Sequence, residues 1–445
     1  MSEPRVTPPW LFALTGMPYG VVGSFTGVVM PYLASRAGLK LADIGWFVTL
    51  LFVPTFFQFL YSPIVDFGPR RKEWLVIVAV IGAGCLFGAC QMSLPDHLVP
   101  FLGLAFAGQT IAGLVGSCNG GLMATTMSDA QRGKAGAWYN VGNLSGGGIA
   151  AAVAVYMTGH GYSTTAVGAV LCAMMIIPST AALAIHETKR EIQGTVGEAI
   201  RNLLVEVKAV LWTRAGLTGL LLCLSPVGTA ALANYFSAIA QDYVRADLVH
   251  ELAKLTPEAA KALLDEKVSG VLAFVGGPVG QGLTALGALV GGYLCDRANR
   301  RAMYLLSGAL TAVVGIGMAL SPRSGMTFTV GALTYALVTG FCYAAFTATV
   351  LETIGKDAKS ASTRYSMFTA AGNVAIAYVG LVNSRFALNH GVEGVVASDA
   401  VLNIAGVVVL GLVFWKLGSF GKPKHSDDDP PKPELPTATA RSTSD

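Results

Sequence analysis

Charged residues are scarce in this chain of 445 residues. Asp, Glu, Lys and Arg make up 13% of the sequence, about half of the share in soluble globular domains. Hydrophobic residues make up 53%, and the mean hydropathy is +0.58. These proportions exclude an ordinary water-soluble domain. The basic residues behind the net charge of +4 lie in short clusters between apolar stretches, so they indicate membrane topology and no nucleic-acid partner.

The sequence also lacks the patterns that indicate metal sites, disulfides or catalysis. Its seven cysteines fall in apolar stretches without Cys-x-x-Cys or Cys/His spacing, so we predict no metal site and no disulfide framework. No His-Glu-x-x-His, no Gly-x-Ser-x-Gly and no close carboxylate pair occurs within these stretches. We therefore expect no enzyme and no cofactor.

Long apolar stretches are what the sequence does contain, and each can cross a bilayer, which takes about 20 residues. The first begins near Trp10 without a preceding cluster of positive charges, which is typical of an uncleaved helix rather than a signal peptide. We predict an all-α polytopic membrane protein with twelve transmembrane helices. Their expected ranges are 10–33, 42–66, 74–93, 99–127, 136–158, 163–185, 213–241, 269–295, 302–321, 326–354, 363–385 and 399–419.

The twelve stretches divide into two groups of six. We expect an N-terminal bundle over residues 1–185 and a C-terminal bundle over 213–420, joined by a cytoplasmic amphipathic connector at 186–212. An external loop at 242–268 interrupts the second bundle, and Thr256, Pro257 and Glu258 predict the start of a short helix there. The tail at 421–445, rich in Pro, Asp, Ser and Thr, is expected to be disordered.

Most of the 30 Lys and Arg residues fall on one side of this arrangement, together with both termini. Positively charged loops tend to stay in the cytoplasm. We therefore expect both termini to be cytoplasmic and the chain to be a multi-pass monomer in the inner, or plasma, membrane, with the lipid bilayer as a partner.

Two segments of the chain repeat one another. Each has an aspartate at the end of a helix followed by arginines: Asp66, Arg70 and Arg71 in the first half, and Asp296, Arg297, Arg300 and Arg301 in the second. At the same sequence offset, Lys134 corresponds to Arg364, and Asn143 corresponds to Asn373. Two separate anchor pairs in one register indicate duplicated six-helix halves.

The pattern small-x-x-x-Asp-x-x-x-Arg-Arg resembles the motif that follows the second helix in the major facilitator superfamily. The first copy departs from it, with Phe67 in place of a basic residue and Pro69 in the turn. The resemblance implies a major facilitator-type fold with two pseudo-symmetric six-helix halves. The run from Phe52 through Asp66 to Trp74 is further similar to AmpG-type muropeptide permeases and the related acetyl-CoA transporters. Siderophore permeases have a similar build.

The paired motifs predict two contacts that close one end of the molecule. A carboxylate at a helix end can accept hydrogen bonds from the free N–H groups at the start of a neighbouring helix, where the helix dipole is positive. The resemblance implies that Asp66 faces the start of helix 11 near Arg364, and that Asp296 faces the start of helix 5 near Lys134. The alternative is that these charges only set the topology and anchor the helix ends.

Polar side chains within the spans are few, and in lipid they should face a cavity or another helix. The alternative for each of them is a hydrogen bond between helices. The candidates for lining a solute cavity are Tyr19, Gln58, Gln109, Asn119, Asn143, Asn234 and Asn373.

Glu352, near the inner end of helix 10, is an ionisable residue that stands apart from the motif aspartates. It is the candidate proton site, because a proton-coupled carrier needs a protonatable group in the membrane. The alternative is an ion pair with Arg364 or Lys356. The lack of Lys or Arg in the middle of a span argues against a strong anion site.

Duplicated halves, paired aspartates and glycine-rich helices together predict a secondary transporter that works by alternating access. The resemblance implies a small polar organic solute of muropeptide, acyl-CoA or siderophore type, with protons as a further partner. The alternative is a membrane receptor or sensor that keeps the fold without transport, because a fold alone does not determine function.

Overall fold

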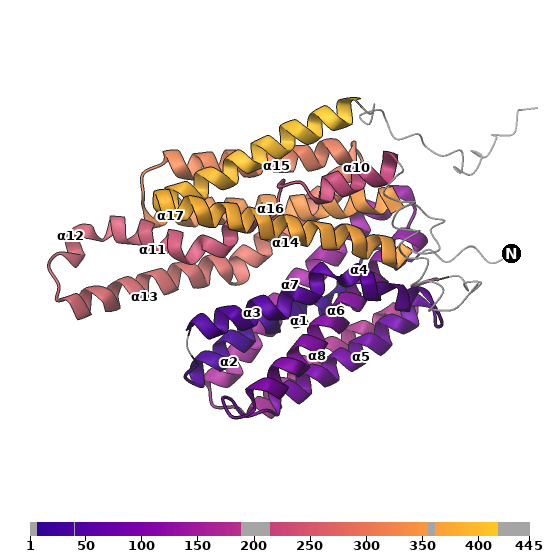
Figure 1. The fold of residues 1–445 in the computed structure, drawn as a ribbon, viewed down its shortest axis with the longest axis horizontal. Helices are drawn as coiled ribbons and strands as arrows, with labels where there is room; N and C mark the ends of the chain where they lie inside the picture. The colour runs from indigo at the N-terminus through magenta and orange to yellow at the C-terminus, as the bar shows by residue number, and fades with distance from the viewer. Residues whose placement is uncertain (1–6, 40, 188–213, 355–360, 417–445) are drawn as a thin grey trace, which may run out of the picture.

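The structure, a computed structural model, describes residues 7–39, 41–187, 214–354 and 361–416. Within these ranges every regular element is a helix, as the long apolar stretches predict. The helices form two bundles that lie side by side, the first drawn from indigo to magenta and the second ending in orange and yellow (Figure 1). The predicted tail and all of the predicted connector except His186 and Glu187 lie outside the described residues.

The N-terminal bundle contains six crossings, and four of them are built from more than one element. The second crossing bends by 49° between Phe56 and Gln58, close to Pro54, which cannot donate a hydrogen bond within the helix. The elements are α1 (Leu11–Ser24), the π-helical turn η1 (Phe25–Val29), α2 (Met30–Arg36), α3 (Leu41–Phe56), α4 (Gln58–Tyr61), η2 (Ser62–Asp66), α5 (Arg71–Cys90), α6 (Leu98–Thr126), η3 (Asp129–Gln131), α7 (Arg132–Gly159), α8 (Thr164–Ser179) and η4 (Thr180–Ala184).

The C-terminal bundle is arranged in the same way and ends in a single long element that Gly391 divides. At Gly391 the backbone leaves the helical region, with φ 60° and ψ −146°, a conformation that glycine adopts without steric cost. The elements are α10 (Arg214–Cys223), η5 (Ala231–Tyr235), α11 (Phe236–Asp247), α12 (Val249–Leu252), α13 (Pro257–Gly276), α14 (Pro278–Cys295), α15 (Arg300–Leu320), α16 (Gly325–Ile354) and α17 (Ala361–Lys416).

The number of crossings follows from these elements. Among the described residues, nine helices are long and apolar enough to span a membrane, and the bent pair of α3 with α4 and η2 adds a tenth. The break at Gly391 makes two crossings of α17, and α10 with α11 supplies the remaining one. The described chain therefore contains the twelve crossings that the sequence predicts.

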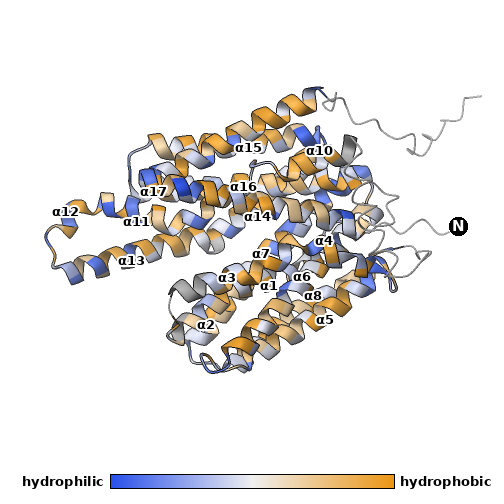
Figure 2. Cartoon of the chain, viewed as in Figure 1, coloured by the Kyte–Doolittle hydropathy of each residue, from blue (hydrophilic) through white to orange (hydrophobic). Residues whose placement is uncertain are grey.

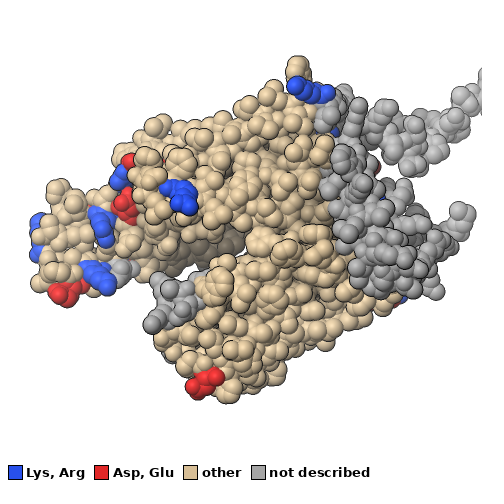
Figure 3. All heavy atoms as spheres, in the orientation of Figure 1, with Lys and Arg blue, Asp and Glu red and all other residues tan. Residues whose placement is uncertain are grey.

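The outer surface suits a bilayer. Hydrophobic residues cover the outer faces of both bundles (Figure 2), and side chains such as Ile177, Val313 and Leu381 are mostly exposed. Lys, Arg, Asp and Glu gather at the ends of the molecule and leave the broad face between them free of charge (Figure 3). A broad exposed apolar face of this kind is stable only in contact with lipid.

The hydrophobic core shows where the bundles meet. One cluster of buried residues contains side chains of both bundles, among them Leu75 and Leu122 from the first and Phe341 and Phe368 from the second. Two further clusters each lie within one bundle. The shared cluster lies toward the side where the described chain begins and ends, here called the terminal side. At the opposite, distal side a hollow separates the bundles (Figure 3).

Two sequence predictions in the second bundle need correction. The segment expected as an external loop at 242–268 is largely helical: α11 runs to Asp247, and α13 continues to Gly276. The helix start predicted at Thr256, Pro257 and Glu258 is confirmed, because the Thr256 side chain caps α13. The pair of α11 and α13 projects beyond the body of the molecule (Figure 1). The helix expected over 213–241 is interrupted between Cys223 and Ala231. The polar residues of the segment 242–268 lower its hydropathy, so hydropathy alone predicts a loop. The segment nevertheless forms helices, which are α11 and α13.

Candidate solute cavity and contacts between the bundles

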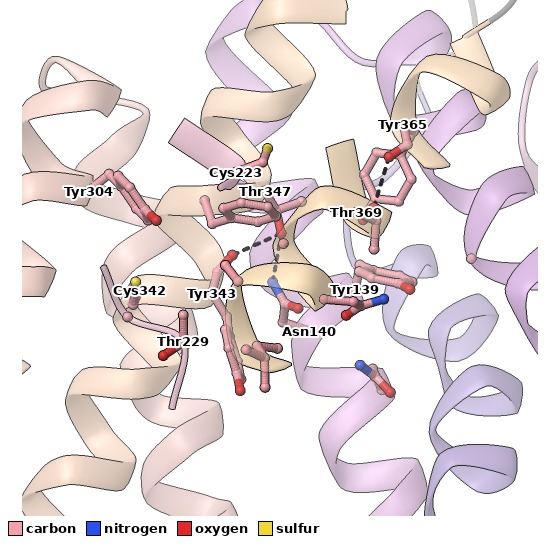
Figure 4. A pocket seen from close by; sticks show the side chains of 18 of the residues that line it. Tyr139, Asn140, Cys223, Thr229, Tyr304, Cys342, Tyr343, Thr347, Tyr365 and Thr369 are labelled. Atoms are coloured by element: carbon pink, nitrogen blue, oxygen red, sulfur yellow. Dashed lines mark hydrogen bonds between the residues drawn. The ribbon is translucent and has the colours of Figure 1, made fainter. Parts of the chain in front are cut away.

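A cavity of about 280 Å³ lies between the two bundles, and both contribute to its wall. Figure 4 shows Tyr139 and Asn140 on one side and Tyr304, Cys342 and Thr229 on the other. Its polar and aromatic lining comprises Tyr19, Gln58, Tyr139, Asn140, Asn143, Ser225, Thr229, Tyr304, Tyr343, Phe346, Thr347, Tyr365, Thr369 and Asn373.

Four of the seven candidates for cavity lining reach this wall: Tyr19, Gln58, Asn143 and Asn373. The repeat places Asn143 on α7 and Asn373 on α17, so each bundle contributes one member of the repeated pair. The Asn373 Nδ2 group donates to the Thr55 carbonyl of the other bundle at 3.4 Å. One asparagine therefore both lines the cavity and joins the bundles.

The other three candidates, Gln109, Asn119 and Asn234, lie outside the cavity. Asn119 is fully buried and joins α6 to α1, donating to the Thr15 carbonyl at 2.9 Å and accepting from the Thr15 hydroxyl at 2.6 Å. The Gln109 carbonyl accepts from the Thr26 hydroxyl at 3.1 Å. Asn234 is exposed on η5. Asn119 and Gln109 therefore form hydrogen bonds between helices, which was the alternative to lining a cavity.

The cavity wall is polar but uncharged. No Asp, Glu, Lys, Arg or His of the described chain lines it. Two buried polar atoms in the wall have no hydrogen-bond partner among the described residues: Gln58 Oε1 on the first bundle and Thr229 Oγ1 on the second. Because a buried polar atom without a partner is costly, these two atoms are places where a solute can bind.

The wall contributed by Thr229 is a break in the seventh crossing. Pro226 has no backbone N–H, and Gly228 has φ +63°, which favours glycine. A Cβ atom at Gly228 would lie 1.9 Å from Cys342 Sγ. The sequence at this break therefore excludes a continuous helix, and it exposes backbone and short side chains to the cavity.

Asp66 sits at the terminal side, at the start of α17. Its carboxylate accepts from the Thr363 backbone N–H at 3.0 Å and from the Thr363 hydroxyl at 2.8 Å. Arg71 forms an ion pair with it at 2.7 Å, and both side chains are 3% exposed. Arg71 also donates to the Ser362 hydroxyl at 2.9 Å. This buried group therefore joins the end of the second crossing to the first turn of the eleventh.

Asp296 makes the corresponding contact at the start of α7. It accepts from the backbone N–H groups of Gly133 at 2.8 Å and Lys134 at 3.0 Å. Its arginine, Arg300, is 4.0 Å away and also donates to the Asp129 carbonyl of the first bundle. Burial raises the pKa of Asp296 in spite of these donors. The second contact thus lacks the close buried ion pair of the first.

Three further motif arginines, Arg70, Arg297 and Arg364, do not contact the motif aspartates in any contact described here. Arg70 pairs with Glu73 in its own loop. The Arg297 guanidinium lies over the Tyr293 ring at 4.0 Å. The Arg364 Nε atom is buried and has no hydrogen-bond partner within the described residues. Of the motif residues, Asp66, Arg71, Asp296 and Arg300 are therefore those whose side chains bridge the two bundles.

Glu352 lies at the terminal end of α16, outside the cavity. It pairs with Arg300 at 3.3 Å and with Arg301 at 3.8 Å. The ion-pair partners are therefore the motif arginines rather than Arg364, and Lys356 lies outside the described residues. The Glu352 side chain is 39% exposed, so it lies at the surface of this end of the bundle.

Several lining residues were missing from the sequence-based candidates. Tyr139, Tyr304 and Tyr365 line the cavity and are nearly buried. A tyrosine in an apolar span fits a lipid interface equally well, so the sequence contains no signal that separates these positions. Thr229 was missed because the break that exposes it was interpreted as a helix; its signal was the nearby Pro226 and Gly228.

Twelve crossings in two bundles, with a cavity between them that is closed at one side, define a polytopic membrane transporter. Residues 12–246 match the Major Facilitator Superfamily. Since the match covers more than half of the chain, the chain belongs to the Major Facilitator Superfamily. No curated protein matches it.

Solved structures with the same fold cover nearly all of the chain. The human organic anion transporter MFSD10 (TETRAN) has a TM-score of 0.62 at 14% identity, covering 91% of this chain and 100% of that one. The E. coli fucose:proton symporter FucP, in its outward conformation, has 0.62 at 11%, with coverages of 91% and 98%. The proton:xylose symporter XylE has 0.61 at 12%, with coverages of 92% and 95%.

The family membership and these likenesses confirm the predicted fold class and the prediction of a transporter rather than an enzyme. At such low identity the likeness shows the fold alone. The narrower resemblance to AmpG-type permeases and acetyl-CoA transporters, the solute and the coupling to protons stay predictions.

Proposed function

We propose that the chain is a secondary transporter of a small, uncharged organic solute that carries hydroxyl or amide groups. The observation that carries the proposal is the pair of unpartnered atoms, Gln58 Oε1 and Thr229 Oγ1, in opposite walls of the cavity. A hydroxyl or amide of the solute donates to the Gln58 oxygen, and another group pairs with the Thr229 hydroxyl. The tyrosine rings supply an apolar surface for the carbon skeleton.

Size and charge favour this class over the larger solutes implied by the family resemblance. A cavity of about 280 Å³ lies at the lower end of the range for small-molecule sites, about 300–1,000 Å³. An acyl-CoA carries phosphates that call for Arg or Lys, and none of the described lining residues is basic. Muropeptides and siderophores are larger than the cavity and remain in the test as competitors.

The shape of the molecule supports transport by alternating access. The bundles share a core at the terminal side and separate toward the distal side. Asp66 and Asp296 each join one bundle to a helix start in the other. We propose that these contacts form when the distal side is open and break when the bundles rock to open the terminal side. By the distribution of positive charge, the terminal side is the cytoplasmic one.

Counterflow in proteoliposomes tests the proposed function. Detergent-purified protein is first screened by thermal shift against neutral sugars, polyols and amides, with acyl-CoA, muropeptide and siderophore preparations alongside, because a bound solute raises apparent stability. The solute that binds is then used for counterflow. We expect a neutral solute to bind and exchange. Binding without exchange would favour the receptor, and binding of acyl-CoA alone would contradict the proposed solute class.

Thr229→Val is expected to weaken binding of that solute about fivefold or more, because a solute hydrogen bond is lost and no protein partner replaces it. Stability should change little, since the Thr229 hydroxyl has no partner within the described protein. Thr284→Val is the matched control: its buried hydroxyl bonds to the Gly280 carbonyl, and it does not line the cavity. The measurement is the dissociation constant in detergent. Equal affinity in wild type and Thr229→Val would remove Thr229 from the site.

A further inference from the structure

A carboxylate outside the cavity and outside the motif contacts is buried in the twelfth crossing. Asp399 lies in the part of α17 that follows Gly391, and its side chain is fully buried. Among the described residues it is the one acidic side chain with no exposed surface. Burying an acid in a membrane span costs free energy, so a residue placed in this way indicates a functional site.

The surroundings of Asp399 consist of hydrogen-bond donors and no cation. The Tyr335 hydroxyl is 3.3 Å from Oδ2, Asn383 Nδ2 is 3.4 Å from Oδ1, and Asn403 Nδ2 is 3.3 Å from Oδ2. No ion pair of the described chain includes Asp399. These donors stabilise a carboxylate, while burial without a cation favours a neutral acid, so both protonation states suit the site.

The groups that titrate near Asp399 are few. Tyr335 of α16 is the titratable side chain in contact with it. From α15, Gly315 packs against the neighbouring Ala400, and from η5 the Leu232 backbone reaches the carboxylate. The nearest charged group in the sequence of α17, Glu393, is exposed and paired with Arg323 at the distal end.

A hydrogen-bonded chain leads from Asp399 to the cavity wall. Asn403 donates through Nδ2 to Asp399, and its Oδ1 accepts from the Gly228 backbone N–H at 2.8 Å. Gly228 lines the cavity at the break in the seventh crossing, next to Thr229. Only one side chain, Asn403, therefore separates the buried carboxylate from the backbone beside the proposed solute contact.

We propose that Asp399 is a proton-binding site, and that proton binding there changes the position of the helix break at Gly228 and Thr229 through Asn403. The proposal goes beyond the proposed function because it names the residue that would couple proton binding to movement of the helix break. Only the link from this movement to solute binding rests on the proposed function.

The chemistry of the step is the addition of one proton to one carboxylate oxygen. Oδ2 accepts from both the Tyr335 hydroxyl and the Asn403 amide, so a proton placed on Oδ2 displaces or reverses at least one of these two contacts. If the Asn403 amide loses Oδ2 as an acceptor, it keeps its bond to the Asp399 backbone carbonyl at 2.9 Å and turns about that bond. The Asn403 oxygen that accepts from the Gly228 N–H moves with it. Loss of the proton restores the contacts. The break then alternates between two arrangements with the protonation state.

The first test measures proton binding without solute. Attenuated-total-reflection infrared difference spectra of reconstituted full-length protein are recorded from about pH 4 to about pH 9. We expect the carboxyl C=O signal to lose one component in Asp399→Asn. Glu393→Gln is the matched control, since it makes the same change on an exposed acid of the same helix, and it should keep that component. A component retained in Asp399→Asn would overturn the site.

The second test measures the movement of the break, again without solute. In a cysteine-free background, Thr229→Cys is labelled with a membrane-impermeant maleimide. At each pH its labelling rate is divided by the rate for the double variant that carries both Thr229→Cys and Asp399→Asn. The ratio removes the intrinsic pH dependence of the thiol. We expect it to change about fivefold or more over the titration. A constant ratio would show that the proton does not reach the break.

Asn403→Leu keeps the test decisive if Asp399→Asn does not fold. This variant keeps the carboxylate but removes the link to Gly228, so the infrared component should remain. The labelling rate of Thr229→Cys, divided by the rate of the double variant Thr229→Cys and Asn403→Leu, should then change with pH about fivefold or more. A ratio that stays constant with pH would exclude the route through Asn403. Because neither readout uses solute, a wrong solute class leaves both results interpretable.

Discussion

Asp66→Asn is expected to lower the rate of solute counterflow by about tenfold or more while changing the dissociation constant less than about threefold. Asp66 contacts α17 and Arg71 at the terminal side and does not line the cavity. The amide that replaces it places N–H groups toward the Arg71 and Thr363 donors, and it removes the negative charge that Asp66 presents to the buried Arg71 guanidinium. Breaking a buried ion pair in this way costs about 3 kcal/mol or more. The arrangement closed at the terminal side should lose most of this stabilisation.

Glu73→Gln is the matched control for Asp66→Asn. Glu73 lies in the same loop and pairs with Arg70, but that pair is partly exposed and stays within one bundle. Pairs of this kind contribute at most about 1 kcal/mol, so counterflow should be close to that of the wild type. The measurements are counterflow in proteoliposomes and binding in detergent. Unchanged counterflow in Asp66→Asn would show that Asp66 only anchors the helix end.

The structure further predicts that Asp296→Asn has the smaller effect of the two motif variants. Both aspartates accept from helix N–H groups, but Arg71 is 2.7 Å from Asp66 while Arg300 is 4.0 Å from Asp296. Burial also raises the pKa of Asp296, so part of the gain from ionisation is already lost there. The same counterflow assay ranks the two variants. A larger loss in Asp296→Asn would contradict the ranking.

Gly120→Ala is the second change with a large expected effect, since it should prevent closure at the terminal side. A Cβ atom at Gly120 on α6 would lie 2.0 Å from Tyr365 Cγ on α17. This ring atom is close to the backbone, so the contact is relieved only if α17 moves away. Closure should therefore lose about 1–3 kcal/mol by overpacking, and counterflow should fall by about tenfold or more.

Gly103→Ala separates this contact from the general effect of glycine in a helix. Gly103 lies on the same helix, and a Cβ atom there would meet nothing within 4 Å. Alanine favours a helix over glycine by about 1 kcal/mol at both positions, so only the packing differs. Gly103→Ala should transport like the wild type. Equal losses of counterflow in Gly120→Ala and Gly103→Ala would show that the effect comes from replacing glycine in α6 and not from the contact with Tyr365.

The sequence predicts most of the fold because the bilayer limits the choices. Apolar stretches of membrane length must be helices, and the repeat around Asp66 and Asp296 divides them into two halves. The break near Gly228 shows the limit of this reasoning. Pro18 and Pro226 occupy matching sequence contexts, yet α1 continues through Pro18 while the seventh crossing stops near Pro226. At the break, Asn403 accepts from the Gly228 N–H, and it comes from a helix that is distant in sequence.

Asp399 shows why the site was harder to predict than the fold. His390, Gly391 and Glu393 lower the hydropathy before it, so the last helix was expected to begin at Asp399 itself, where an acid is unremarkable. In the structure α17 continues through this segment, and Asp399 lies inside the bundle. The cavity candidates met the same limit, because an amide in a span fits a helix contact, as in Asn119, or a cavity wall, as in Asn143. Only the packing of the helices distinguishes them.

Distances between the bundles test the central claim, that the distal side is open while the terminal side is closed, and that the two alternate. Spin labels at Val99 and Leu388 report on the distal side, and labels at Leu183 and Trp415 report on the terminal side; all four positions are exposed. Double electron–electron resonance is recorded with and without the solute that binds. We predict that the distal distance shortens as the terminal distance lengthens. Asp66→Asn should likewise shorten the distal distance and lengthen the terminal one. Distances that change together in the same sense, or that do not respond to Asp66→Asn, would contradict alternating access controlled by these contacts.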